Sequence, residues 1–388
     1  MNQFTLPPSK LPNVGTTIFA IMSGLANEHN AVNLSQGFPD FMCSEKLIDL
    51  VSHHMKAGKN QYAPMPGELL LRQRIAHKMD KLYNVLIDPI HEITITAGGT
   101  QALFTALGAF ISPGDEVIIV EPAYDSYKPS IELFGGKAVP YALKAPDYQL
   151  DWAAFEQLIT PSTRMIMFNN PHNPTGRVFN ENDLDILQRL VVKHNLLLIS
   201  DEVYEHLVYD GLSHSTALSH PDLYERSMVI FSFGKTYHNT GWKVGYCIAP
   251  PEITREFRKI HQFNVFSVNT SIQAAYADFM VDENEYLGLN TFYQQKRDLL
   301  LDLMKHSPFK ALKCEGSYFQ LFDYSAISNE VDIEYSKRLI LENGVATIPL
   351  SVFYSQAPPD NVIRLCFAKK EETLRSAAEK LMLVRSKT

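Results

Sequence analysis

Lys235 is the residue of this sequence whose surroundings most clearly suggest chemistry. The segment Ser232–Lys243 reads Ser-Phe-Gly-Lys-Thr-Tyr-His-Asn-Thr-Gly-Trp-Lys, and it sets a hydroxyl and two amines among small and turn-forming residues. A lysine amine can attack an aldehyde cofactor and form an imine. That role needs a phosphate anchor, a carboxylate for a ring nitrogen and donors for a ring oxygen. Taken alone, Lys235 would be expected at the surface, because lysine is seldom buried.

Four polar groups could supply these companions, and each follows an apolar segment that resembles a strand. In an open parallel sheet, ligands collect beyond the carboxyl ends of the strands. The groups are Gly98–Gln101, Glu121–Asp125, Asn169–Gly176 and Asp201–Tyr204.

Gly99, Thr100 and Gln101 open a predicted helix, where free amides and the helix dipole favour an anion such as phosphate. The alternative is a tight turn with an ordinary helix start. The segment lacks the G-x-G-x-x-G pattern of dinucleotide-binding folds and is not a Walker loop. Tyr124 could present its ring face to a planar cofactor. Alternatively, Tyr124 is a packed core aromatic.

Asn173 lies in a loop that Pro171, Pro174 and Gly176 keep from being helical. Its amide is a candidate donor to a phenolic oxygen, and the alternative is a solvated turn. Asp201 follows a strongly apolar strand, where an acid is costly unless it has a partner. A protonated pyridinium nitrogen would be such a partner.

Together these residues predict a site for pyridoxal 5′-phosphate. Lys235 would form the imine and later carry the proton between the substrate α-carbon and the cofactor. Asp201 would keep the ring nitrogen protonated, so that the ring accepts electrons. Tyr204 and Asn173 would bind the ring oxygen and lower the pKa of the imine. Phosphate would be bound by Ser232, Lys243 and the helix start at Gly99, Thr100 and Gln101.

The composition excludes several other classes of protein. The chain has 388 residues, of which 45% are hydrophobic and 20% charged, and this length favours about two domains. A net charge of −8, without a basic run, gives no reason to expect nucleic acid or an anionic membrane as a partner. The N-terminus does not resemble a signal peptide, and no apolar run reaches membrane-spanning length.

The four cysteines are scattered and form no C-x-x-C pair, which predicts neither a metal site nor a redox motif. Such spacing in a large chain is typical of reduced thiols in a cytoplasmic protein.

Alternating patterns predict the elements that position these residues. Strands are expected at 92–96, 116–120, 165–168, 196–199, 229–231 and 244–249, and helices at 68–83, 100–110 and 182–194. This alternation predicts an α/β fold with a mostly parallel sheet sandwiched by helices. A long helical stretch near 271–305 precedes a smaller α+β unit, with strands at 317–322 and 362–367 and helices at 333–342 and 371–384. We expect an N-terminal arm at 1–45 that contributes to the small domain, a large cofactor-binding domain at 46–285 and a small domain at 286–388.

From about residue 15 to 385, the chain resembles the class I, fold-type I pyridoxal-phosphate aminotransferases. Within them it is similar to the branch of kynurenine aminotransferases and bacterial methionine aminotransferases. The combination of motifs is highly specific, although no single one is. The motifs are residues 34–40, Gln61-Tyr62, 169–176, 201–204, 232–243 and 363–367.

This resemblance implies roles for further residues. Arg364 would bind the substrate α-carboxylate in a bidentate pair, helped by Gly37 and Asn173. The alternative for Arg364 is a surface salt bridge, although its apolar strand neighbours argue against that. Tyr62 would reach the phosphate of the neighbouring subunit, which implies a homodimer with shared active sites. Phe19 and Phe266 would line the side-chain pocket, with Phe266 supplied by the partner subunit.

Two departures from the family bear on the substrate. Members that favour aspartate use a second arginine, and this chain has none between Arg258 and Arg297, where the resemblance places the distal pocket. Thr100 and Ser267 stand where kynurenine-type members carry an aromatic residue and a histidine. The missing arginine favours an apolar or mixed substrate side chain over a dicarboxylate. The differences at Thr100 and Ser267 argue against a kynurenine aminotransferase, so that methionine is the foremost expected substrate.

The sequence therefore predicts an aminotransferase that moves the amino group of a neutral or aromatic L-amino acid to a 2-oxo acid. Kynurenine transamination or β-elimination from cysteine S-conjugates on the same scaffold is an alternative. A non-enzymatic regulator that senses the cofactor would need an added DNA-binding domain. Only about 15 residues precede the family-like region, which is too few for such a domain. A dehydrogenase is disfavoured by the absent glycine pattern.

Overall fold

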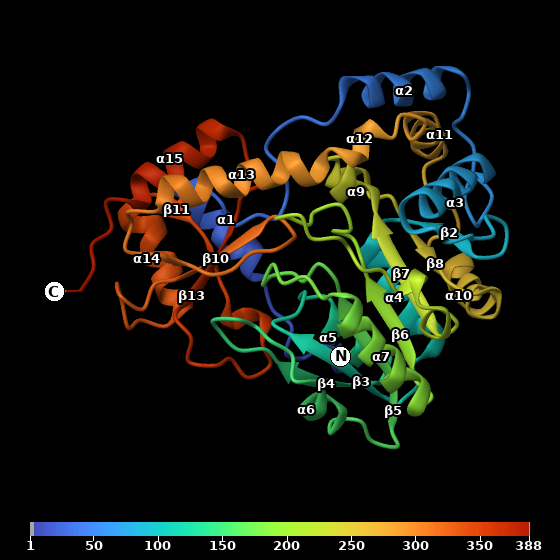
Figure 1. Ribbon diagram of the computed structural model, residues 1–388, viewed down its shortest axis with the longest axis horizontal. Coiled ribbons are helices and arrows are strands. Elements are labelled where there is room, and N and C mark those ends of the chain that lie inside the picture. Colours follow the sequence, from blue (N-terminus) through green and yellow to red (C-terminus); the bar gives the residue numbers. More distant parts are fainter. Residues whose placement is uncertain (1–3, 388) are drawn as a thin grey trace.

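The computed structural model describes residues 4–387 and consists of a large α/β unit and a smaller α+β unit. Helix α13 (Leu289–Met304) runs from one unit into the other (Figure 1). No helix among residues 4–387 combines the length and the apolar character that crossing a bilayer requires.

A seven-stranded sheet forms the centre of the large unit, in the order β2-β8-β7-β6-β5-β3-β4. Only β8 runs antiparallel to its neighbours β2 and β7, so the expected mostly parallel sheet is confirmed. The strands of this sheet are β2 (Ile93–Thr96), β3 (Glu116–Glu121), β4 (Lys137–Ala142), β5 (Thr163–Asn169), β6 (Leu197–Asp201), β7 (Ser227–Ser232) and β8 (Gly245–Ile248).

Both faces of the sheet are covered, which explains its nearly continuous apolar strands. Along β3, Val117 and Ile119 join one core cluster, while Ile118 and Val120 join the other. Helices α4 (Gly99–Phe110), α5 (Tyr127–Leu133) and α10 (Pro251–Asn264) supply apolar side chains to the first cluster. The second cluster draws on α3 (Leu69–Tyr83), α7 (Glu181–Lys193), α8 (Pro221–Tyr224) and α11 (Thr270–Phe279).

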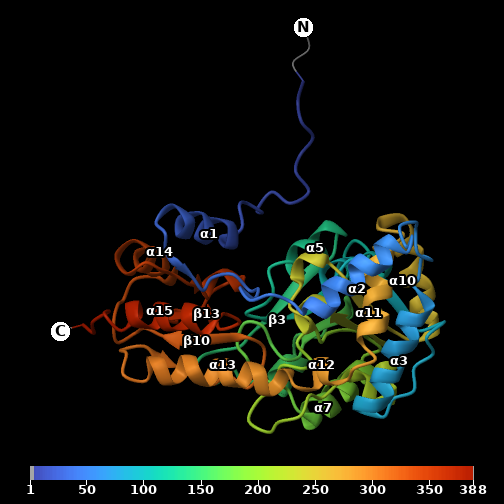
Figure 2. The same ribbon diagram turned by 90° about the horizontal axis from the view of Figure 1, so that it is seen from above.

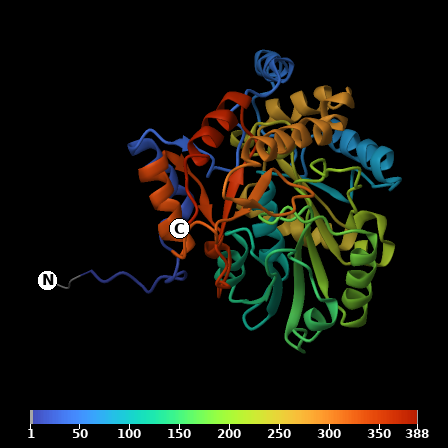
Figure 3. The ribbon, with the colours of Figure 1, turned by 60° about the vertical axis from the view of Figure 1, so that its left-hand side comes forward.

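The smaller unit combines the two ends of the chain. Its antiparallel sheet has the order β12-β13-β10-β9, and β1 (Val32–Asn33) pairs in parallel with β11 (Val345–Ala346). Blue N-terminal and red C-terminal elements therefore lie side by side in Figures 1 and 3. The elements are α1 (Ile18–Glu28), α14 (Asp332–Asn343), α15 (Glu371–Leu381), β9 (Lys310–Ala311), β10 (Phe319–Asp323), β12 (Ile348–Pro349) and β13 (Val362–Cys366).

Residues 4–17, which precede α1, extend away from both units (Figure 2). The remaining helices are α2 (Glu45–Lys56), α6 (Trp152–Glu156), α9 (Phe233–Thr236) and α12 (Asn284–Leu287). The two units also touch near the end of β3, where Ser355 donates from its backbone and its hydroxyl to the buried Glu121 carboxylate, at 2.9 and 2.7 Å.

The single long helix expected near 271–305 is wrong, because the chain forms α11, α12 and α13 there. Asp282 accepts hydrogen bonds from the backbone and side chain of Asn284 and so turns the chain after α11. Gly288 then separates α12 from α13. Strand β4 was not expected. It contains Pro140 and lies at the edge of the sheet, where a missing N–H is tolerated.

Candidate active site

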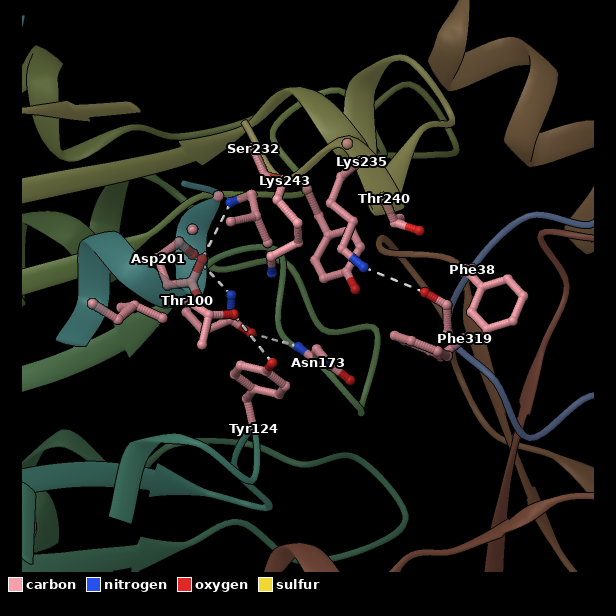
Figure 4. Close-up of a pocket in the computed structure, with 18 of the residues that line it drawn as sticks. Phe38, Thr100, Tyr124, Asn173, Asp201, Ser232, Lys235, Thr240, Lys243 and Phe319 are labelled. Carbon is pink, nitrogen blue, oxygen red and sulfur yellow. Dashed lines mark hydrogen bonds between the residues drawn. The ribbon is translucent and has the colours of Figure 1, made fainter. Parts of the chain in front are cut away.

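A cavity of about 270 Å³ lies beyond the carboxyl ends of the parallel strands. It brings together residues that the sequence predicted from segments far apart in the chain (Figure 4). The predicted residues that line it are Phe19, Gly37, Gly99, Thr100, Tyr124, Asn173, Asp201, Tyr204, Ser232, Lys235, Lys243 and Arg364.

Lys235 lies in the short helix α9, directly after β7. Its Nζ donates to the Tyr318 hydroxyl at 2.7 Å and to the Gly37 carbonyl at 3.3 Å. Burial lowers the pKa of Lys235 to about 8, because the charged form loses its hydration. The neutral amine, which is the nucleophilic form, is therefore more populated near neutral pH than in an exposed lysine.

Asp201 ends β6 and is 4% exposed. The Tyr127 hydroxyl donates to one carboxylate oxygen at 2.5 Å, and the Val203 amide donates to the other at 3.3 Å. Burial raises the pKa of Asp201 to about 6, against the opposing effect of the Tyr127 hydrogen bond. No salt bridge to Asp201 is found among residues 4–387, so the carboxylate is suited to a cationic ligand.

The start of α4 and Lys243 form a site suited to an anion. Gly98 has φ +82° and Lys243 has φ 55°, and these left-handed conformations turn both segments toward each other. A Cβ on Gly98 would lie 3.4 Å from the Lys243 Nζ. On Gly245, a Cβ would come within 3.0 Å of the Gly99 nitrogen, so glycine permits the close approach of these backbones. The helix N-terminus and the ammonium both favour negative charge.

Asn173 and Tyr204 line the same cavity as Asp201 and Arg364. The Asn173 amide donates to the Asn169 side chain, which in turn donates to the Asp201 carbonyl. Tyr204 is 3% exposed, and burial raises its pKa, which keeps the phenol protonated as a donor. On the other side of the cavity, the Tyr124 and Thr100 hydroxyls are 3.3 Å apart.

Arg364, in β13, is a buried cation that forms no salt bridge with a described carboxylate. It is 2% exposed and donates to Asn173 Oδ1 at 3.1 Å and to the Ser35 carbonyl at 3.3 Å. The centroid of the Phe319 ring lies 3.9 Å from the guanidinium carbon. The rings of Phe19 and Phe353 lie at 5.4 and 5.1 Å. Burial lowers the pKa of Arg364 to about 10, and its Nε has no hydrogen-bond partner in the described chain.

Three predicted residues do not line the cavity of this chain, namely Gln101, Tyr62 and Phe266. Gln101 turns its side chain to the Ala97 amide and to Thr105. Tyr62 is 83% exposed, and its ring contacts Phe266 edge-on at 5.5 Å, outside the cavity.

Sequence reasoning missed several residues of the cavity wall and one important neighbour. Phe38, Thr240 and Phe319 line the cavity, and Tyr318 contacts Lys235. Tyr318 and Phe319 lie in a run of apolar residues that resembles an ordinary core strand. The segment also contains the polar residues Ser317 and Gln320, so the tyrosine hydroxyl did not stand out as a functional group.

The donor set fits a phosphorylated pyridine aldehyde. An amine of lowered pKa, a buried carboxylate and an anion-binding helix start share one cavity. Arg364, with its unpartnered Nε, offers a place for a further carboxylate. Among the described residues, no three His, Cys, Asp or Glu side chains are grouped to hold a metal ion.

Comparison with known proteins gives consistent matches. Residues 29–381 match the family described as aminotransferase class I and II. The methionine aminotransferase of Escherichia coli (strain K12) is 50% identical, over 98% of this chain and 99% of its own length. Human kynurenine–oxoglutarate transaminase 1 is 35% identical, over 92% and 93% of the two chains.

Solved structures agree with these matches. The crystal structure of YbdL from Escherichia coli, for which a methionine aminotransferase function was identified, superimposes with a TM-score of 0.96. It is 49% identical and covers 97% of this chain and 99% of its own. The N-succinyldiaminopimelate aminotransferase of Mycobacterium tuberculosis gives a TM-score of 0.94 at 34% identity, with 98% and 100% coverage.

Proposed function

Because this chain belongs to the class I and II aminotransferase family, we propose that it moves the amino group of a neutral or aromatic L-amino acid to a 2-oxo acid. Methionine is the donor we expect to be preferred. The observation that carries the proposal is the grouping of Lys235, Asp201 and the unpaired Arg364 around one cavity. The 50% identity with a methionine aminotransferase supports it.

We assign the cofactor as pyridoxal 5′-phosphate, which supplies an electron sink for the substrate α-carbon when bound. Ser232, Lys243 and the amides at the start of α4 hold the phosphate. Asp201 would pair with the ring nitrogen, while Tyr204 and Asn173 would donate to the ring oxygen, and all three line the cavity.

The reacting amino acid is held by its carboxylate. Arg364 offers two parallel N–H donors, and Asn173 orients the guanidinium. Once the Lys235 amine is free, it would accept the proton from the substrate α-carbon as a general base. It would then donate that proton, as a general acid, to the aldehyde carbon that the cofactor contributes on the other side of the substrate nitrogen. Its lowered pKa suits both steps near neutral pH.

The cavity wall supports a substrate without a second charge. Within residues 4–387, Arg364 is the one arginine that lines the cavity, and we assign Lys235 and Lys243 to other groups. Phe19, Phe38 and Phe319 offer apolar surface to the substrate side chain. A second carboxylate would be desolvated there without a partner.

A series of donors tests this proposal. With one 2-oxo acid as acceptor, kcat/KM should be highest for methionine, followed by phenylalanine, with kynurenine and histidine also measured. Aspartate should be poor, and robust aspartate activity would contradict the proposed pocket. Lys235→Ala serves as the inactive control and Lys46→Ala, on the surface, as the active one.

Kynurenine transamination remains the second candidate, because human kynurenine–oxoglutarate transaminase 1 matches most of the chain. Release of pyruvate from a cysteine S-conjugate without an acceptor would instead identify β-elimination. Neither the regulator nor the dehydrogenase gains support, since the matches are to aminotransferases over nearly the full length.

We further propose a homodimer located in the cytoplasm. Tyr62 and Phe266 are exposed in the single chain, which suits residues that serve the active site of a neighbouring subunit. All four cysteines are free thiols, as expected in a reducing compartment.

A further inference from the structure

Tyr318 lies against the reactive amine although it belongs to the smaller unit. It precedes β10, its side chain is fully buried, and its oxygen accepts a hydrogen bond from the Lys235 Nζ at 2.7 Å. The Tyr318 hydroxyl itself donates to the Gly37 carbonyl. A buried hydroxyl needs partners, and here both partners belong to the active site.

The Tyr318 hydroxyl donates its proton to the Gly37 carbonyl, so its oxygen is an acceptor for Lys235. Burial, with the neighbouring Tyr204, raises the pKa of Tyr318 well above its usual value, so the phenol stays protonated. Its remaining lone pairs can only accept. One N–H of Lys235 therefore points to Tyr318, and a second points to the Gly37 carbonyl.

A tetrahedral nitrogen with two N–H bonds held in this way has one substituent position left. In the neutral amine that position is the lone pair. No further hydrogen bond of the Nζ is found within residues 4–387. The lone pair is therefore the position available to attack a carbonyl carbon or to accept a proton.

The backbone beneath Tyr318 is held firmly. Ser317 has φ 62°, and its amide donates to the Leu207 carbonyl at 3.0 Å. Its carbonyl accepts from the Tyr209 hydroxyl. A Cβ on Gly316 would lie 2.8 Å from both the Leu207 oxygen and Pro171, so this backbone packs directly on the larger unit. Such support suits a group that must hold another in place.

We propose that Tyr318 is a positioning residue for Lys235, which together with the Gly37 carbonyl orients the free amine and leaves its lone pair open for reaction. This role rests on the proposed function, since it concerns the same lysine. Tyr318 does not need to touch the substrate to act in this way.

Tyr318→Phe tests the role, because it removes the oxygen and keeps the ring. Its kcat for methionine should fall by about tenfold, because the amine samples other orientations. The KM should stay close to that of the native protein, since Arg364 is unaffected. Tyr293→Phe is the matched control, because it removes an equally buried hydroxyl, which forms a hydrogen bond with His238. The centroid of the Tyr293 ring lies 6.0 Å from that of Tyr318.

A second readout does not depend on turnover. In protein stripped of cofactor, the pH dependence of acetylation of Lys235 by acetic anhydride can be followed by mass spectrometry. The midpoint, the pH at which acetylation of Lys235 is half-maximal, should be lower in Tyr318→Phe than in the native protein. The Lys235 ammonium loses the Tyr318 oxygen, an acceptor that stabilises the charged form. Other groups that act on this amine are unchanged in both variants, namely Cys366, Arg364, Lys243, Asp201 and Tyr204.

An unchanged midpoint, or an unchanged kcat, in Tyr318→Phe would overturn the proposal. A higher KM with native kcat would also overturn it, since that result assigns Tyr318 to substrate binding. If Tyr318→Phe does not fold, Tyr318→Leu must lower the midpoint in its place. Native protein that fails to bind pyridoxal 5′-phosphate through Lys235 would refute the proposed function instead, and the acetylation midpoints would still decide the role of Tyr318.

Discussion

Burial acts in opposite directions on the two central ionisable residues of the site. It lowers the pKa of Lys235 to about 8 and raises that of Asp201 to about 6. Desolvation disfavours the charged form in both cases. As a result, a base and an acid whose usual pKa values are far apart both titrate close to neutral pH, where general acid–base chemistry is most effective.

The pKa of Asp201 predicts how cofactor binding depends on pH. Above about pH 6 the carboxylate is ionised and can pair with the pyridinium nitrogen, whereas below that pH it is protonated. Affinity for pyridoxal 5′-phosphate should therefore weaken as the pH falls from 7 to 5. Absorbance titrations at several pH values measure this. Asp201→Asn should bind more weakly and lose most of the dependence, and a native affinity independent of pH would contradict the assignment.

Single residues were predictable where polarity and position coincide. Asp201 is the last residue of an apolar strand and Asn173 lies in the loop after another, and the structure places both at the cavity. Tyr318 was missed because its role depends on a hydroxyl that meets Lys235 from 83 residues away in the chain. Phe353 was missed for a related reason, since nothing local to an aromatic residue shows that it will face an arginine.

At the scale of elements, the segment that carries Gly37 is packed tightly against β10. A Cβ on Gly37 would lie 2.9 Å from Phe319, whose ring covers Arg364. Gly37→Ala should displace that ring and raise the KM for methionine several-fold, while the cofactor absorbance stays. Gly24→Ala is the control, because a Cβ there meets nothing within 4 Å. Because Gly24 lies in the interior of α1, Gly24→Ala should raise the free energy of unfolding by about 0.5–1 kcal/mol. An unchanged KM in Gly37→Ala would contradict this prediction and show that the segment around Gly37 shifts without displacing the Phe319 ring.

Helix α3 is tied to the segment after β6 by a buried ion pair. Lys78 donates to Glu205, and both side chains are almost fully buried. Burial alone would raise the pKa of Glu205, but Lys78 and His206 outweigh it and lower the pKa to about 2. The pair lies just beyond Asp201 and Tyr204, so it anchors the segment that carries them.

Removing one partner of this ion pair should lower the free energy of unfolding, whereas replacing both partners with apolar residues should change it little. Lys78→Met leaves a buried, unpaired carboxylate and should lower the free energy of unfolding by about 3–5 kcal/mol. The double variant Lys78→Met/Glu205→Leu should recover most of that loss, since neither charge remains. Urea denaturation of both variants measures the difference. A double variant as unstable as the single one would assign the stability to the Tyr83 and Tyr246 hydrogen bonds of the network instead.

Elements were predictable where one local pattern dominated. The strands of the large sheet are apolar runs bounded by turns, so β3, β5, β6 and β7 lie where expected. The break between α11 and α13 was not predicted, although the polar run 282–285 and Gly288 interrupt the apolar spacing there. Side-chain hydrogen bonds around Asp282 decide that turn.

At the scale of the whole molecule, the proposed sharing of active sites between subunits can be tested by mixing two inactive variants. Tyr62→Ala and Lys235→Ala homodimers should each be impaired. After subunit exchange, one site of each mixed dimer would combine Lys235 of one chain with Tyr62 of the other, and activity should return. Recovery is absent if Tyr62 acts within its own chain. Size-exclusion chromatography with light scattering provides the control for the dimeric state.

The contribution of a partner subunit to the site is a proposal that rests on resemblance alone. Tyr62 and Phe266 carry no local signal of function, and in one chain they lie outside the cavity. By contrast, the α/β fold and the two units follow from alternation of elements along this chain.

The pairing of β1 with β11 means that the chain passes between the two units twice, once after residue 34 and once along α13. Two covalent connections define a line, so any rotation of the smaller unit against the sheet has a preferred hinge axis through them. The hydrogen bonds between Ser355 and Glu121 form a third link. Arg364 lies on the rotating side while Lys235 and Asp201 stay with the sheet, so a rotation about that axis would change the distance between the substrate carboxylate and the amine.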